Sequence, residues 1–190
     1  MTKSQLYQEL KAVNHSKEKR AFYANMLISN PKLTPILLDI VFDVNDNMSP
    51  RAAWVLEFAC KENIAFIIPY LETFTKNINT IYIDSAVRPA AKICEMIAKA
   101  YTSKTNHVIK KHLTVSQQKR IIETCFDYLI SKQKVAAKAY GMVALFLLGK
   151  HHDWVHQELI LILERDYSSQ SAAYKARARV ILKKVKKNAF

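Results

Sequence analysis

Apolar residues recur along the chain at intervals of three and four, the spacing that places them on one face of an α-helix. Signals that begin or end helices interrupt this pattern, among them Asn30-Pro31, Ser49-Pro50 and Gly149. No segment shows the alternation expected of a half-buried strand. The pattern therefore predicts an all-α protein of about ten helices, mostly about 12–17 residues long and joined by short turns.

Three residues make local predictions that a structure can test. Pro69 lies in an apolar helix expected over 63–76 and either occupies its first turn or kinks it. Gly149 follows the apolar helix 134–148 and is expected at the position just past its end, where glycine adopts the left-handed conformation. Asp153 is expected to cap the helix that follows.

The helical pattern also repeats. Four helices carry a basic residue followed by small residues and then aliphatic ones, and the basic residues lie 37, 50 and 37 positions apart. The middle interval also becomes 37 if 13 residues after Tyr101 are an insertion. A period near 40, with two helices per period, is typical of HEAT and armadillo arrays. The four basic residues are Arg51, Arg88, Lys138 and Lys175.

The repeat predicts a HEAT/armadillo-like α–α superhelix of four to five helical hairpins. Residues 1–190 then form a single domain, in which 1–48 are N-terminal capping helices and 49–190 are repeats. The insertion falls near residues 102–114. A helical bundle without repeats is the alternative reading of the same pattern.

Composition agrees with a helical, intracellular protein. Half of the 190 residues are hydrophobic, and only 2 are glycine and 5 proline, too few glycines for a chain rich in tight turns. Cys60, Cys94 and Cys125 are odd in number, form no CxxC motif and lie in apolar patterns, as expected of buried thiols in a reducing compartment. With no apolar leader and no run of about 18 apolar residues, we expect a cytoplasmic protein without membrane contact.

Charge is distributed unevenly along the chain. Residues 1–95 contain 11 Lys and Arg against 10 Asp and Glu, whereas residues 96–190 contain 18 against 6. Basic residues one helical turn apart, without carboxylates between them, repel one another unless an anion screens them. The C-terminal half therefore presents either a phosphate-binding surface or a solvated face. The candidate anion-binding residues are Lys110, Lys111, Lys119, Arg120, Lys175, Arg179, Lys183 and Lys186.

Several segments carry a resemblance to a small bacterial family of HEAT-like proteins without an established activity. They are Arg51-AAWVLEFACKENIAFIIPYLETF, Asp84-SAVRPAAKICE, Lys134-VAAKAYGMVALFLLG and Asp153-WVHQELILILERDYSSQSAAYKARARVILKKV, and the resemblance covers about residues 49–185. Members of that family are sometimes labelled adenylosuccinate lyase. A lyase of that family needs a mobile Gly-Ser-Ser loop, but the only glycines here are Gly141 and Gly149, in or ending one apolar helix. We therefore expect no enzyme activity and no catalytic residue.

A looser resemblance connects the chain with HEAT-like DNA alkylation repair glycosylases, which hold DNA against a basic surface. The shared features are helical repeats, basic character and two tryptophans, Trp54 and Trp154. No motif here matches that family's catalytic aspartate with its aromatic neighbours. The resemblance therefore implies nucleic-acid binding rather than catalysis.

Histidines and arginines offer two further candidate groups. His152 and His156 lie four apart, a spacing that can hold a metal, but a third ligand cannot be named, and we expect no metal and no cofactor. Arg51 and Arg88 begin repeat helices, where a basic residue usually bonds to the adjoining repeat, so we interpret them as structural.

Three hypotheses about function follow. The first is a non-enzymatic helical-repeat scaffold that binds a protein or peptide. The second is nucleic-acid binding through the basic C-terminal half, with a role in DNA repair as one form of it. The third is an enzyme related to adenylosuccinate lyase, which no motif supports.

Overall fold

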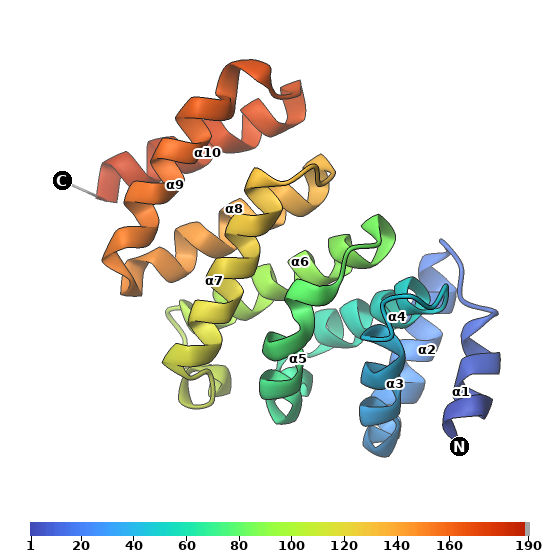
Figure 1. Cartoon of the computed structure of the whole chain (residues 1–190). Coiled ribbons are helices and arrows are strands. Elements are labelled where there is room, and N and C mark those ends of the chain that lie inside the picture. Colours follow the sequence, from blue (N-terminus) through green and yellow to red (C-terminus); the bar gives the residue numbers. More distant parts are fainter. Residues whose placement is uncertain (189–190) are drawn as a thin grey trace. The chain divides into compact units, whose positions relative to one another are not determined.

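The computed structural model describes residues 1–188, and all regular secondary structure in this part of the chain is helical (Figure 1). It contains ten α-helices, α1 to α10, connected by short 3-10 segments, η1 to η6, and no strand within the described residues. The all-α prediction is therefore confirmed. The finer prediction, a HEAT/armadillo-like superhelix, remains a prediction.

The chain divides into two compact units, Met1–Ile93 and Cys94–Phe190. We refer to them as unit 1 and unit 2 and describe each by itself. The prediction of a single repeat domain did not include such a division.

Unit 1 is organised around α4, against which α2 and α3 both pack. Its buried side chains are mainly aliphatic and belong to every helix of the unit, for example Leu6, Leu27, Leu38 and Leu56. The elements of unit 1 are α1 (Lys3–Leu10), α2 (Lys17–Ser29), η1 (Pro31–Leu33), α3 (Thr34–Val41), α4 (Ser49–Glu62), η2 (Ile64–Tyr70), α5 (Leu71–Asn77), η3 (Ile78–Thr80) and the first part of α6 (Asp84–Tyr101).

Unit 2 is organised around α8, which packs against α7, α9 and α10. The apolar helix α8 buries side chains on nearly all sides because neighbours surround it, as its almost continuous apolar sequence requires. Besides the last part of α6, the elements of unit 2 are η4 (Val108–Lys111), α7 (Val115–Ile130), α8 (Val135–Leu148), η5 (Gly149–His151), α9 (Asp153–Asp166), η6 (Tyr167–Ser169) and α10 (Ala172–Asn188).

The three local predictions have different outcomes. Pro69 does interrupt the helix expected over 63–76, because residues 64–70 form the 3-10 segment η2 and the α-helical turns begin only at Leu71. Proline cannot donate a backbone hydrogen bond, so a tighter, shorter helical form occupies this position. Asp153 is the first residue of α9 rather than its cap, and its carboxylate lies at the positive end of the helix dipole.

Gly149 is required for a reason other than the one predicted. Its φ is −59°, within the right-handed region, and the chain continues into η5. A Cβ at this position would lie 2.4 Å from Cδ2 of the His156 ring. The expected left-handed helix end is therefore wrong, and the glycine instead allows the ring of His156 to approach the backbone.

The cysteine prediction is confirmed in its structural part. Cys60, Cys94 and Cys125 are all free and buried. A hydrogen bond with Cys94, reinforced by burial, raises the pKa of the Cys125 thiol well above its usual value. Such thiols are unreactive at neutral pH and act as small apolar side chains in the core.

Candidate functional site

All eight candidate anion-binding residues lie in unit 2, where they form two separate groups. Lys110 and Lys111 belong to η4, and Lys119 and Arg120 to the first turns of α7. The other four lie on α10. Figure 1 shows α10 at one end of unit 2 and the segment that leads into α7, which includes η4, at the other. The structure therefore does not bring the two groups together at one site.

The first group is partly engaged in holding the polypeptide in place. Lys110 is half-buried, and its Nζ donates to the backbone oxygen of Ser103 at 2.6 Å, which fixes the loop after α6. Arg120 is half-buried, whereas Lys111 and Lys119 are exposed. Only the two exposed lysines of this group project fully into solvent.

The second group belongs to a larger basic surface along α10, which we call the α10 face. One side of α10 is buried through Tyr174, Ala178, Ile181 and Val185, all at most 2% exposed. The helix contains no acidic residue among its 17 positions. Like charges therefore follow one another at intervals of one turn without an intervening carboxylate. The α10 face consists of Lys175, Arg177, Arg179, Lys183, Lys184, Lys186 and Lys187.

Few acceptors neutralise the α10 face. Lys186 forms an exposed ion pair with Glu164 at 2.7 Å, and Arg179 donates from Nη2 to the hydroxyl oxygen of Tyr167 at 3.2 Å. Glu164, Tyr167, Arg179 and Leu182 line a pocket of about 370 Å³ between α9, η6 and α10. No other ion pair of this face occurs among the described residues, so most of its positive charge is uncompensated.

The histidines near η5 are occupied by hydrogen bonds. Nε2 of His152 donates to Oε1 of Gln118 at 3.1 Å, and Nε2 of His156 donates to the backbone oxygen of Phe146 at 2.8 Å. Burial, with the charges of His151 and Lys119, lowers the pKa of His152 below its usual value. Among the described residues no group of three or more His, Cys, Asp or Glu side chains could hold a metal ion.

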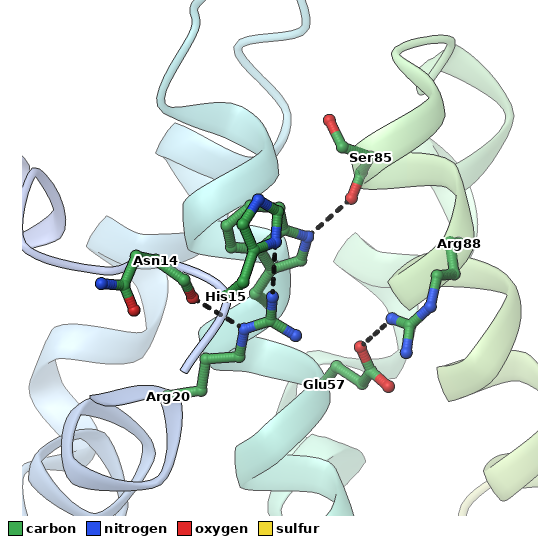
Figure 2. Close-up of polar contacts among 7 residues, drawn as sticks. Asn14, His15, Arg20, Glu57, Ser85 and Arg88 are labelled. Atoms are coloured by element: carbon green, nitrogen blue, oxygen red, sulfur yellow. Dashed lines mark hydrogen bonds and ion pairs between the residues drawn. The ribbon is translucent and has the colours of Figure 1, made fainter. Parts of the chain in front are cut away.

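Unit 1 contains a polar cluster that the sequence analysis did not predict (Figure 2). We call it the Trp54 cluster and define it as Arg20, Trp54, Glu57 and Arg88, from α2, α4 and α6. The guanidinium carbon of Arg20 lies 4.4 Å from the centroid of the Trp54 ring. Trp54 donates from Nε1 to the backbone oxygen of Ser85 at 2.8 Å, so the indole is held by both neighbouring helices.

Two hydrogen bonds orient Arg20 further. Its Nε donates to the backbone oxygen of Asn14 at 3.0 Å, and its Nη2 lies 3.4 Å from Nδ1 of His15. Burial, together with the charge of Arg88, lowers the pKa of Arg20 from its usual value, while Glu57 opposes this change. Nothing in the spacing of Arg20 along α2 singles it out, because the indole over which it lies belongs to Trp54, 34 positions further along the chain.

Arg51 and Arg88 both donate to acceptors outside their own helices, whereas the prediction that they join adjoining repeats stays a prediction. Nη1 of Arg51 donates to the backbone oxygen of Lys11, just after α1. Nη1 of Arg88 donates to Oε2 of Glu57 at 2.8 Å, and the Glu57 side chain is only 7% exposed. Both residues therefore satisfy acceptors at the ends or flanks of adjacent helices.

The equivalent lysines of unit 2 have no such acceptors. Lys138 is 6% exposed, and its side chain forms no hydrogen bond among the described residues. Its Nζ lies 6.0 Å from the centroid of the Tyr174 ring. Burial lowers its pKa, and the carboxylate of Asp166, already bonded to Arg165, only partly offsets this effect. The hydroxyl of Tyr174 is buried and has no hydrogen-bond partner within residues 1–188, and burial raises the pKa of Tyr174 to about 12.

No helix of the described chain is long and apolar enough to cross a membrane. Comparisons with known proteins add no identification, because no family model, curated protein or solved structure matches this chain. The features of the molecule that bear on function are therefore the α10 face and the Trp54 cluster.

Proposed function

We propose that this protein is a non-catalytic helical binding protein whose unit 2 binds the phosphate backbone of a nucleic acid through the α10 face. The observation that carries the proposal is the accumulation of seven basic side chains on one helix that has no carboxylate of its own. Only Lys186 has a carboxylate partner, Glu164, among the described residues. Bound phosphates would relieve the repulsion among these side chains and release counterions.

The arrangement favours contacts to the backbone rather than to bases. The only aromatic side chain of α10 among the described residues is Tyr174, which is completely buried. Recognition of single strands relies on aromatic side chains on which bases stack, and the α10 face offers none. Lysine and arginine rows bind phosphates without reading sequence. We therefore expect binding that depends strongly on salt and little on nucleotide sequence.

This proposal reverses the order of the first two hypotheses. A protein or peptide partner remains the second candidate, and it is favoured by the exposure of Trp154 and Leu161 at 49% and 62%. The two lie seven positions apart on α9, two turns along the same side of the helix. Cross-linking of the full chain in a cell extract tests this candidate: Leu161→Glu should abolish a specific protein adduct, and Lys183→Gln should not.

No feature of the described residues supports the third hypothesis. Gly141 and Gly149 are both buried, and a Cβ at Gly141 would lie 3.3 Å from the backbone oxygen of Cys125. Two glycines in such tight packing do not provide the mobile loop that a lyase of the resembled family requires. We therefore retain the proposal of a non-enzymatic protein.

The direct experiment measures binding of the full chain to a fluorescent 20-base-pair duplex by anisotropy at several salt concentrations. We expect the association constant to fall steeply with salt, with a slope in the double-logarithmic plot of about −0.9 for each phosphate contact. Arg177→Gln, Lys183→Gln and Lys187→Gln remove three exposed charges of the α10 face, and together they should reduce the slope by about 3.

The matched control removes the same number of charges from unit 1. Lys3, Lys17 and Lys32 are exposed and have no ion pair among the described residues, so the triple Gln variant there changes net charge equally. It should leave the salt dependence nearly unchanged. Equal losses in both triple variants, or no binding at about 50 mM salt, would contradict the proposal.

A further inference from the structure

The Trp54 cluster contains two cations beside a single carboxylate. Figure 2 shows the guanidinium of Arg20 near the Glu57–Arg88 pair, and the Arg20 guanidinium carbon lies 4.4 Å from the centroid of the Trp54 ring. Glu57 is bonded to Arg88 at 2.8 Å, whereas no hydrogen bond joins it to Arg20. The three side chains together carry one uncompensated positive charge.

Both guanidinium groups retain unused donors. A guanidinium has five N–H groups. Arg20 uses one to Asn14 and one toward His15, which leaves three without a partner among the described residues. Arg88 uses one, to Glu57, which leaves four. These donors are accessible, because the Arg88 side chain is 40% exposed and Arg20 is half-buried.

The position of Arg20 is set before any ligand arrives. Its guanidinium lies over the Trp54 ring, and the indole N–H is bonded to the backbone of Ser85 in the first turn of α6. The same turn leads to Arg88, so the two arginines are linked through the indole. Pre-organised donors lose less conformational entropy on binding than freely moving side chains do.

We propose that Arg20 and Arg88 form a binding site for a single phosphate group. A carboxylate has two oxygens, which a single guanidinium fork can occupy by itself. A phosphate group has further acceptor oxygens and can therefore accept from both forks at once. Its negative charge balances the uncompensated charge of the cluster and relieves the repulsion between the two arginines. The site belongs to unit 1 and does not depend on the nucleic-acid proposal for unit 2.

The chain offers a local reporter for this site, because Trp54 and Trp154 are its only tryptophans. In the full-length Trp154→Phe variant, all indole fluorescence comes from Trp54. Titration with inorganic phosphate, at ionic strength held constant with chloride, should give a saturable change in emission. Parallel titrations with a nucleoside monophosphate and with glycerol phosphate then show whether the site has a higher affinity for free phosphate or for a phosphate ester.

Three variants in the Trp154→Phe background test the geometry. Arg20→Gln should weaken phosphate binding at least about tenfold, since it removes charge-assisted donors. Glu57→Gln should tighten binding several-fold, because it removes the carboxylate that competes for Arg88. Lys183→Gln, on the α10 face, should leave the affinity within about twofold, which separates this site from the unit 2 surface.

Opposite results would overturn the proposal. A linear, unsaturable emission change, or equal responses to phosphate and chloride, would show that no phosphate site exists at Trp54. Weaker phosphate binding by the Glu57→Gln variant would also overturn the proposal. That result is expected if Glu57 only holds Arg88 in place and does not compete with phosphate for it. Circular dichroism of each variant confirms that the chain is folded. Because the expected changes in phosphate affinity have opposite signs for Arg20→Gln and Glu57→Gln, a general loss of stability cannot produce both results.

Discussion

Units 1 and 2 are alike in size and helical content, and they differ in the number of their basic side chains and in the partners of those side chains. Unit 1 has 11 Lys and Arg against 9 Asp and Glu, and unit 2 has 18 against 7. In unit 1 the repeated basic position is arginine, and Arg51 and Arg88 both reach acceptors on neighbouring helices. In unit 2 it is lysine, and the side chains of Lys138 and Lys175 form no hydrogen bond or ion pair among the described residues.

This difference shows that one sequence pattern can serve two physical purposes. An arginine fork carries five donors and can satisfy a carboxylate or a helix-end carbonyl at some distance from its backbone. A lysine at the same position offers a single ammonium group, and in unit 2 it meets an aromatic ring or solvent instead. In unit 1 the repeated basic position therefore stabilises contacts between helices. In unit 2 the same position carries a positive charge that is either at the surface, at Lys175, or poorly solvated in the interior, at Lys138.

The largest expected effect is the loss of the Arg88–Glu57 pair. Arg88→Met leaves the nearly buried carboxylate of Glu57 without its partner, and we expect it to reduce the free energy of unfolding by about 2 kcal/mol. The expected value lies below that for a fully buried pair, because solvent reaches the Arg88 side chain. Urea denaturation measures the change. In the Arg88→Met, Glu57→Gln double variant, part of the lost free energy of unfolding should be restored. A double variant that is less stable than Arg88→Met alone would contradict the assigned role of the pair.

The matched substitution in unit 2 should have the opposite sign. Lys138→Met replaces a buried ammonium group, which has no hydrogen bond in the described part of the chain, by an apolar side chain of similar length. We expect it to raise the free energy of unfolding at pH 7 by about 1 kcal/mol. Because burial lowers the folded-state pKa of Lys138, the gain is complete below that pKa and shrinks as pH rises toward the unfolded value. Destabilisation at pH 7 would show that Lys138 has a structural partner.

Tyrosine hydroxyls provide a smaller contrast of the same kind. Tyr174→Phe removes a buried hydroxyl without a partner and should stabilise the protein by up to about 1 kcal/mol. In unit 1, Tyr23 donates from its hydroxyl to Oε2 of Glu9 at 3.1 Å, so Tyr23→Phe should be neutral or slightly destabilising. Thermal denaturation of both variants measures the difference. The comparison fails if Tyr174→Phe destabilises more than Tyr23→Phe does.

The smallest effect concerns pH. Burial lowers the pKa of His152 below 6.5, so the folded state favours the neutral ring. Its contribution to stability is present above pH 6.5 and is lost as pH falls through that value, since the unfolded chain then binds the proton first. His152→Gln should therefore lose less stability than the wild type between about pH 7.5 and 5.5. If the melting temperatures of the wild type and of His152→Gln change with pH in parallel, His152 does not contribute to the pH dependence of stability.

Local features of the chain were largely predictable from its sequence. The apolar periodicity located the helices, and local capping also follows from the sequence, since Thr114 and Gln117, three positions apart, form a reciprocal capping box at the start of α7. Pro69, expected in the first turn of its helix or at a kink, lies in the 3-10 segment that precedes the α-helical turns. These features depend on residues within one or two turns of each other, which is the range that a sequence pattern describes well.

Features that depend on distant contacts were not predictable. The role of Gly149 depends on the ring of His156, and the orientation of Arg20 depends on an indole 34 residues away. The sequence also could not separate the basic residues into the two groups that lie at different ends of unit 2 (Figure 1). Side chains on successive helices meet only once the packing is known.

By itself, the sequence determined an all-helical chain with buried thiols and a strongly basic C-terminal half, because periodicity and composition are local quantities. Tertiary structure alone decided which cations are neutralised. Arg88 forms an ion pair with Glu57, whereas Lys138 contacts only the ring of Tyr174 and Arg20 lies over the ring of Trp54. A positive charge becomes structural when packing brings an acceptor to it, and it remains available for a ligand where packing brings none.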